Sequence, residues 1–85
     1  MDIADLRAAM YAAHPLEKLP PPERRMAMRV AAGVTVDDAA RAMGIDPARL
    51  EHWETRVSPR VRASYRYRKL LAALETRTGR SDTQV

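Results

Sequence analysis

The 85-residue sequence contains no cysteine and no phenylalanine, and aromatic residues make up only 5% of it. The absence of cysteine excludes a disulfide framework and a thiolate metal site. With so few aromatics, the core must be small and built from aliphatic residues, methionine, alanine and the single tryptophan. A chain of this length supports one hydrophobic core. We therefore expect one small domain, which a partner chain would help to stabilise.

The sequence also lacks an apolar run long enough to cross a bilayer, and Asp2, Asp5 and Arg7 near its start are unlike a signal peptide. No nucleophile and base pair, glycine-rich phosphate loop or carboxylate pair stands out. His14 and His52 are far apart, and no carboxylate or thiol set completes a metal site around either. We expect a cytoplasmic protein that is not an enzyme, with no catalytic residues, metal, cofactor, membrane contact or evident small-molecule substrate.

Acidic residues are missing from one long basic stretch, and the net charge of the chain is +4. A run of basic residues is often only a solvated helix face. Clustering of one sign also favours a polyanionic partner. The stretch contains Arg56, Arg60, Arg62, Arg66, Arg68 and Lys69, and an earlier basic group contains Arg24, Arg25 and Arg29.

Helical periodicity and capping residues predict an all-α fold of about five helices and no strand. Asp2, Thr35 and Asp46 are the expected N-caps, and Gly33 and Gly44 are the expected helix ends. Pro20 to Pro22 form a stiff connector before the second helix. The expected helices cover about 2–13, 23–32, 36–43, 47–56 and 61–76, the last in one or two pieces. Its apolar members are Val61, Tyr65, Leu70, Leu71 and Leu74.

A tight turn between the third and fourth helices is the most informative local feature. Gly44 ends one helix and Asp46-Pro47 begins the next, with Ile45 as the linking residue. So short a turn makes the helices cross steeply, and a steep crossing requires small residues such as Ala39 and Ala40 at the contact. The apolar residues that would close the core around the turn are Met43, Ile45, Leu50 and Trp53. The side chains expected to face outward on the fourth helix are Ala48, His52, Thr55 and Arg56, with Arg49 and Glu51 on the flanks.

This pattern resembles the helix-turn-helix of the Cro/repressor (Xre-like) family over about residues 23–74. The matching residues are the segment 33–45, Leu50 and Trp53-Glu54. The resemblance implies a lambda-repressor-like fold and a bacterial or phage transcriptional regulator, with repression as its favoured role. We expect an N-terminal helix and Pro-rich connector (1–22), a helix-turn-helix DNA-binding domain (23–76) and a flexible tail (77–85), frayed over 81–85 as chain termini often are.

The resemblance also assigns roles to residues on a double-stranded DNA site, with the fourth helix in the major groove. Arg49 would bind a guanine edge, or else a phosphate or solvent. Glu51 would accept from cytosine, orient Arg49 or face solvent, and Arg29 would pair with Glu54 or contact a phosphate. The expected base contacts are Ala48, Arg49, Glu51 and His52. The expected backbone contacts are Arg29, Thr35, Val36, Arg56, Arg60 and Arg62.

The sequence departs from the family pattern in two ways, and the first predicts sparse direct readout. Val36 and Pro47 stand where members of that family that read bases with glutamine carry it, and neither side chain can form a hydrogen bond. Asp37 lies near the expected phosphate path, where its charge is unfavourable unless a neighbouring arginine compensates. Shape readout would then contribute. A homodimer is the economical arrangement for a specific binder, formed through the N-terminal helix or the face from Tyr65 to Leu74, unless these pack on the core.

Two other functions fit the same residues. The helices could form a protein–protein interaction module, such as a small phage adaptor or inhibitor, in which the arginines face an acidic partner. Tyr65 and Tyr67 with their neighbouring arginines could instead form a stacking platform for single strands.

Overall fold

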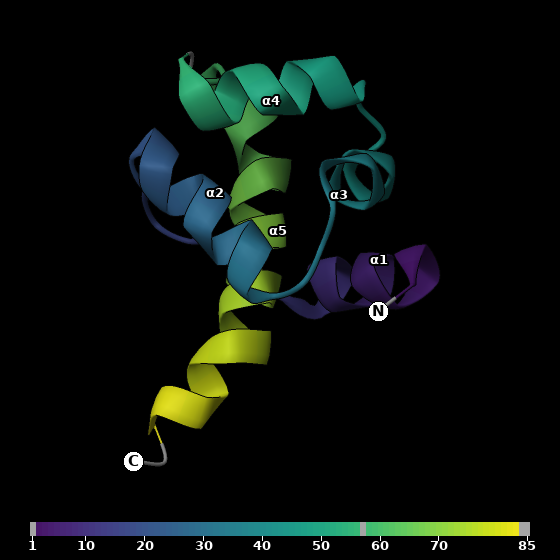
Figure 1. Cartoon of the computed structure of the whole chain (residues 1–85), viewed down its shortest axis with the longest axis vertical. Coiled ribbons are helices and arrows are strands. Elements are labelled where there is room, and N and C mark those ends of the chain that lie inside the picture. The colour runs from purple at the N-terminus through teal and green to yellow at the C-terminus, as the bar shows by residue number, and fades with distance from the viewer. Residues whose placement is uncertain (1, 57, 84–85) are drawn as a thin grey trace.

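The computed structural model describes residues 2–56 and 58–83, of which 79–83 as backbone alone, and these residues form an all-α fold without strands (Figure 1). The fold class predicted from the sequence is confirmed. The helices are α1 (Ile3–Ala12), α2 (Pro22–Ala31), α3 (Val36–Met43), α4 (Pro47–Thr55) and α5 (Val61–Thr83).

Side-chain caps start three of these helices at the expected residues. Asp2 Oδ1 accepts a hydrogen bond from the backbone N–H of Asp5 at 2.9 Å. Thr35 Oγ1 accepts from Asp38 N at 3.1 Å, and Asp46 Oδ1 accepts from Ala48 N at 2.9 Å. Each bond satisfies a backbone donor that the first helical turn leaves without a partner.

The turn between α3 and α4 has the predicted geometry. Gly44 has a φ of 73°, in the left-handed region that favours glycine, and Pro47 begins α4. Figure 1 views α3 along its axis and α4 from the side, so the two helices cross steeply. Ala39 and Ala40 are fully buried and allow this close approach.

The core surrounds α5, which runs through the middle of the molecule with the other helices around its first half (Figure 1). The rings of Trp53 of α4 and Tyr67 of α5 pack against each other at a tilt of 33°, with centroids 5.3 Å apart. Leu6 and Met10 of α1 belong to the same cluster, so α1 packs on the core and is not separate from the helices after residue 22. The larger core side chains are Leu6, Met10, Met28, Met43, Leu50, Trp53, Tyr67, Leu70, Leu71 and Leu74.

Helix α5 differs from the prediction in two ways. It is one continuous helix that reaches Thr83, beyond the expected end at 76, so the expected flexible tail is helical where the structure describes it. Residues 84–85 of the expected frayed end lie outside the described residues. Val61 and Tyr65, expected as apolar members, are 82% and 51% exposed, and Tyr67 lies in the core instead.

The spacing of the residues along α5 explains this correction. Tyr67 lies three residues before Leu70 and four before Leu71, so it shares their buried face of α5. Tyr65 lies two residues before Tyr67 and therefore faces another side of the helix. Val61 is the first residue of α5 and lies at the edge of the core, where it stays exposed. None of the described helices is long and apolar enough to span a membrane.

Candidate nucleic-acid interface

The outer surface of α4 carries the side chains that the sequence assigned to base contact. Ala48, Arg49, Glu51 and His52 are all exposed. The opposite edge of α4 holds Leu50, Trp53 and Glu54, which are buried. The helix therefore presents small and polar groups on one side while the other side anchors it to the core.

An ion pair with α2 fixes α4 in place. Arg29 Nε lies 2.6 Å from Glu54 Oε2, Arg29 Nη2 donates to Glu54 Oε1 at 3.0 Å, and Nη1 donates to the carbonyl of Val34 at 2.8 Å. Both side chains are buried. The predicted Arg29–Glu54 pair is confirmed. Arg29 is wrongly placed among the phosphate contacts, because its nitrogens are engaged inside the protein.

A second buried arginine, which sequence reasoning missed, holds the carboxyl end of α4. Arg25 is 3% exposed, and its Nη1 donates to the carbonyl of Trp53 at 2.6 Å. Its Nε donates to the carbonyl of Pro20 at 2.6 Å, and its Nη2 donates to Ser58 Oγ at 3.0 Å. The signal was present in the sequence, since Arg25 lies three and four residues before Met28 and Arg29 and so shares their helix face.

Tyr67 lies beside this network with its hydroxyl buried. Burial raises the pKa of the Tyr67 hydroxyl well above its usual value of 10, and the charge of Glu54 raises it further, against the opposing charges of Arg25 and Arg29. The hydroxyl oxygen has no hydrogen-bond partner among the described residues. The phenol is therefore held neutral inside the core.

A hollow of about 460 Å³ borders the exposed side of α4, between α2 and the start of α3. Met26 and Val36 supply its apolar part. Glu51, His52 and Arg56 supply charged or polar groups from α4. The hollow adjoins the amino-terminal end of α3, because Val36 is the first residue of that helix.

The remaining residues expected to contact the DNA backbone reach the surface to different extents. Thr35 is exposed while its hydroxyl caps α3, and Val36 is half-buried. Arg56 lies at the end of α4, and Arg60 and Arg62 lie at the start of α5, and all three are exposed.

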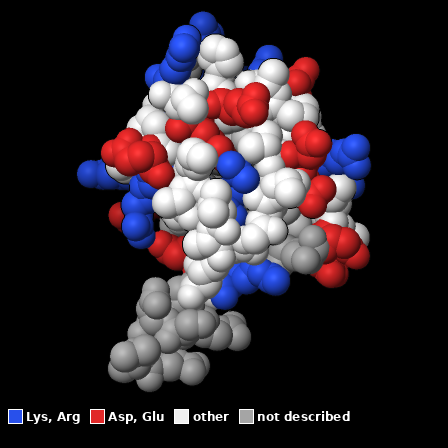
Figure 2. All heavy atoms as spheres, viewed as in Figure 1, with Lys and Arg blue, Asp and Glu red and all other residues white. Residues whose placement is uncertain are grey.

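Several basic residues of the two clusters form contacts within the fold. Figure 2 shows basic and acidic side chains intermixed over the visible face, without a large area of one sign. The later part of the basic run serves structure, because Arg66 donates to the carbonyl of Met43 at 2.7 Å and Arg68 to that of Leu16 at 2.9 Å. Arg25 and Arg29 are buried.

Comparisons with family models, with curated proteins and with solved structures return no match for this chain. Among the described residues, no group of three or more His, Cys, Asp or Glu side chains is placed to hold a metal ion.

Proposed function

We propose that this protein is a sequence-preferring, double-stranded DNA-binding transcriptional regulator, most simply a repressor, that inserts α4 into the major groove. The observation that supports this best is the two-sided character of α4. Its inner edge is fixed by Leu50, Trp53 and the Arg29–Glu54 pair, while its outer side is exposed and polar. A rigid helix with an open polar side suits the width of the major groove.

Arg49 is the main candidate for base readout. Its planar guanidinium can donate to both acceptors on a guanine edge. His52 lies one turn short of the end of α4 and would donate to a base or a phosphate, and Ala48 would contact a thymine methyl. Glu51 would accept from the amino group of cytosine, a donor that this base presents in the major groove.

The backbone contacts would come from the two ends of the helix pair. Arg56, Arg60 and Arg62 are exposed and follow α4 in the chain. The amino-terminal amides of α3, next to Thr35 and Val36, would face a phosphate. The exposed carboxylate of Asp37 opposes this contact, so the three arginines must supply most of the attraction.

A homodimer would place two copies of α4 on successive turns of the major groove, about 34 Å apart. The face from Tyr65 to Leu74, considered as a dimer surface, is largely used by the core, because Leu70, Leu71 and Leu74 are buried. The exposed apolar side chains Val61 and Tyr65 at the start of α5 remain available to a second copy.

The test is selection of binding sites from random duplexes, followed by titration of the selected duplex between 50 and 200 mM salt. We expect affinity to fall as salt rises, with a slope of about −0.9 per neutralised phosphate. Arg49→Ala should weaken the selected site by about 1–3 kcal/mol and relax preference at one position. Arg60→Ala should weaken all duplexes alike, and Arg24→Ala on the exposed side of α2 serves as the matched control.

A helical protein–protein interaction module is the second candidate. It is favoured by Met26 and Val30, which lie one turn apart on α2 and are 46% and 57% exposed. The mixed charges of the visible face also suit a protein partner (Figure 2). If no duplex binds at 50 mM salt, the DNA proposal is overturned and this module becomes the leading function. An unchanged preference in Arg49→Ala would overturn the base-contact role of Arg49 alone.

A further inference from the structure

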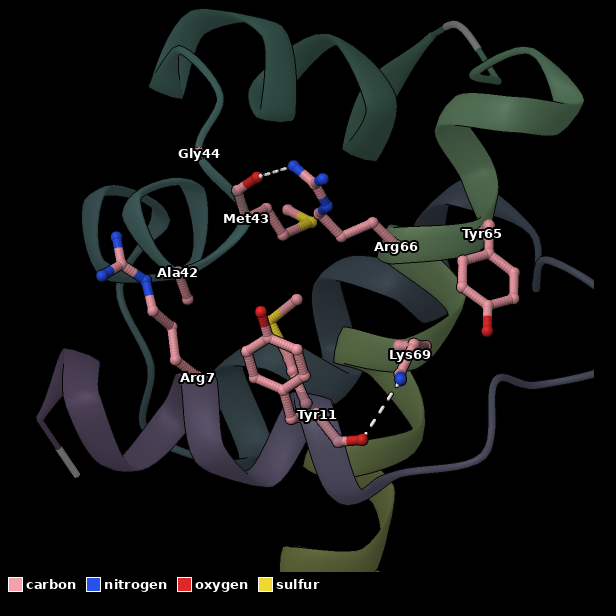
Figure 3. A pocket seen from close by; sticks show the side chains of 9 residues that line it. Arg7, Tyr11, Ala42, Met43, Gly44, Tyr65, Arg66 and Lys69 are labelled. Carbon is pink, nitrogen blue, oxygen red and sulfur yellow. Dashed lines mark hydrogen bonds between the residues drawn. The ribbon is translucent and has the colours of Figure 1, made fainter.

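A second hollow lies away from the outer side of α4, where α1, the end of α3 and α5 meet (Figure 3). Its volume is about 400 Å³, within the range of small-molecule sites. Met10, Ala42 and Met43 supply buried apolar surface. Tyr11 and Tyr65 line it with exposed rings, so an apolar body could lie between aromatic and aliphatic groups.

The charged groups around this hollow are all of one sign. Figure 3 shows Arg7, Arg66 and Lys69 around the ring of Tyr11, with Arg7 from α1 and the other two from α5. None of the described side chains that line the hollow is acidic. This contrasts with the intermixed charges of the face in Figure 2 and favours an anion.

Each of these cations is oriented by a backbone carbonyl. Arg66 Nη1 donates to Met43 O at 2.7 Å, Arg7 Nη2 donates to Arg41 O at 3.0 Å, and Lys69 Nζ donates to Tyr11 O at 3.2 Å. A guanidinium has five N–H donors and an ammonium has three, so one such bond leaves each group with donors for a ligand. A carbonyl also does not neutralise the cation, whereas a carboxylate would.

From this geometry we propose that the hollow between α1, α3 and α5 binds a small organic anion, a carboxylate carried on an aromatic or aliphatic body. The carboxylate contacts Arg66 and Lys69 or Arg7, and the body packs on Met10, Met43 and the tyrosine rings. The size of the hollow fits one small molecule. This proposal does not depend on DNA binding, and it adds a ligand that the sequence did not indicate.

Binding at this site acts directly on the turn before α4. Met43 and Gly44 line the hollow and also form that turn, and Arg66 Nη1 lies 3.8 Å from the position of a β-carbon built on Gly44. A ligand that binds only the folded protein stabilises it, and once its concentration exceeds Kd the stabilisation grows with the logarithm of that concentration. Ligand binding in the hollow should therefore raise the melting temperature.

The experiment is a titration of the full chain with 1-naphthaleneacetate, followed by amide chemical shifts in ¹H–¹⁵N spectra. The neutral 1-naphthaleneacetamide has the same ring and is the matched control ligand. We expect saturable shifts at Tyr11, Met43, Gly44 and Lys69, a rise in melting temperature, and weaker binding of the amide.

Variants of the basic side chains test whether their charges bind the ligand. The double variant Arg7→Gln/Lys69→Gln should bind naphthaleneacetate about fivefold or more weakly. Arg24 is an exposed residue of α2 outside the hollow, so Arg24→Gln should leave the binding unchanged. Arg7→Gln alone, which changes an exposed side chain, gives the same direction of change if the double variant does not fold. Equal binding of the amide, shifts confined to other surfaces, or occupation of the hollow by a second copy in place of the ligand would each overturn the proposal.

Discussion

At the scale of single residues, the hydroxyl of Tyr67 is the most unusual group in the core. The side chain is 1% exposed and its ring packs against that of Trp53, yet its oxygen lacks a hydrogen-bond partner among the described residues. Burying a hydroxyl without a partner costs free energy that an apolar ring would not. The ring therefore stabilises the fold through its packing, and the oxygen works against it.

Tyr67→Phe should stabilise the protein, because it keeps the ring and removes the buried oxygen. We expect a gain of about 1 kcal/mol, which corresponds to a rise of roughly 4–8 °C in the melting temperature of a domain of this size. Thermal unfolding followed by circular dichroism measures this. Tyr65→Phe, at an exposed position, is the control and should change little. A lower melting temperature for Tyr67→Phe would show that the oxygen is satisfied in solution.

Tyr67 should also make the free energy of unfolding depend on pH in the alkaline range. Its pKa is raised in the folded protein, so above pH 10 the unfolded chain loses this proton while the folded chain keeps it. Below pH 10 this group leaves the free energy of unfolding independent of pH, and as the pH rises further it lowers that free energy by up to about 1.4 kcal/mol per pH unit. Urea unfolding at pH 9, 10 and 11 measures the slope. If the free energy of unfolding changes with pH equally in the parent and in Tyr67→Phe, the raised pKa of Tyr67 is not the cause of the dependence.

Residue-level prediction from the sequence succeeded where a partner could be recognised and failed where charge alone was considered. Arg29 was paired with Glu54 through a family resemblance, and the structure confirms the pair. Arg25 has no carboxylate partner among the described side chains, since its bonds go to two carbonyls and a hydroxyl that only the folded chain brings together. Tyr65 and Tyr67 differ by two positions, and only the position of the core relative to α5 decides which is buried.

At the scale of helices, α4 is held in place by side chains of α2 as well as by its packing on α3. Glu54→Gln should be strongly destabilising, because it leaves the guanidinium of Arg29 buried without an opposite charge. We expect a loss of about 2–4 kcal/mol in the free energy of unfolding, close to what breaking other buried pairs costs. Urea denaturation measures it. Glu51→Gln, also on α4 but exposed, should stay within about 0.5 kcal/mol of the parent. Similar effects of the two substitutions would show that the pair adds little.

Helix boundaries followed from local chemistry, and so the sequence located them well. Asp2, Thr35 and Asp46 cap their helices through bonds over two or three residues, which a linear pattern contains in full. The far end of α5 has no such marker before residue 76, and the helix continues to Thr83. The exposed side of α4 was predicted from periodicity and is observed, while its role in binding DNA stays a prediction.

At the scale of the whole molecule, α1 and the helix pair share one core. Leu6 is 1% exposed and packs in the cluster that contains Leu50 and Tyr67. Leu6→Ala should therefore lower the free energy of unfolding by about 2–5 kcal/mol and destabilise every helix together. Hydrogen exchange resolved by residue measures this, with the exposed Tyr11→Ala on the same helix as the control. Faster exchange confined to α1 would mean that α1 unfolds independently.

The two arginines enclosed beneath α4 give the protein an internal reporter of its own folding. Dicarbonyl reagents such as phenylglyoxal modify guanidinium groups that water can reach, so Arg49, Arg56 and Arg60 should be labelled in the native state. Arg25 and Arg29, at 3% and 8% exposure, should be labelled only when α2 and α4 separate. Mass spectrometry of timed labelling would then measure how often α2 and α4 separate in the unmutated chain.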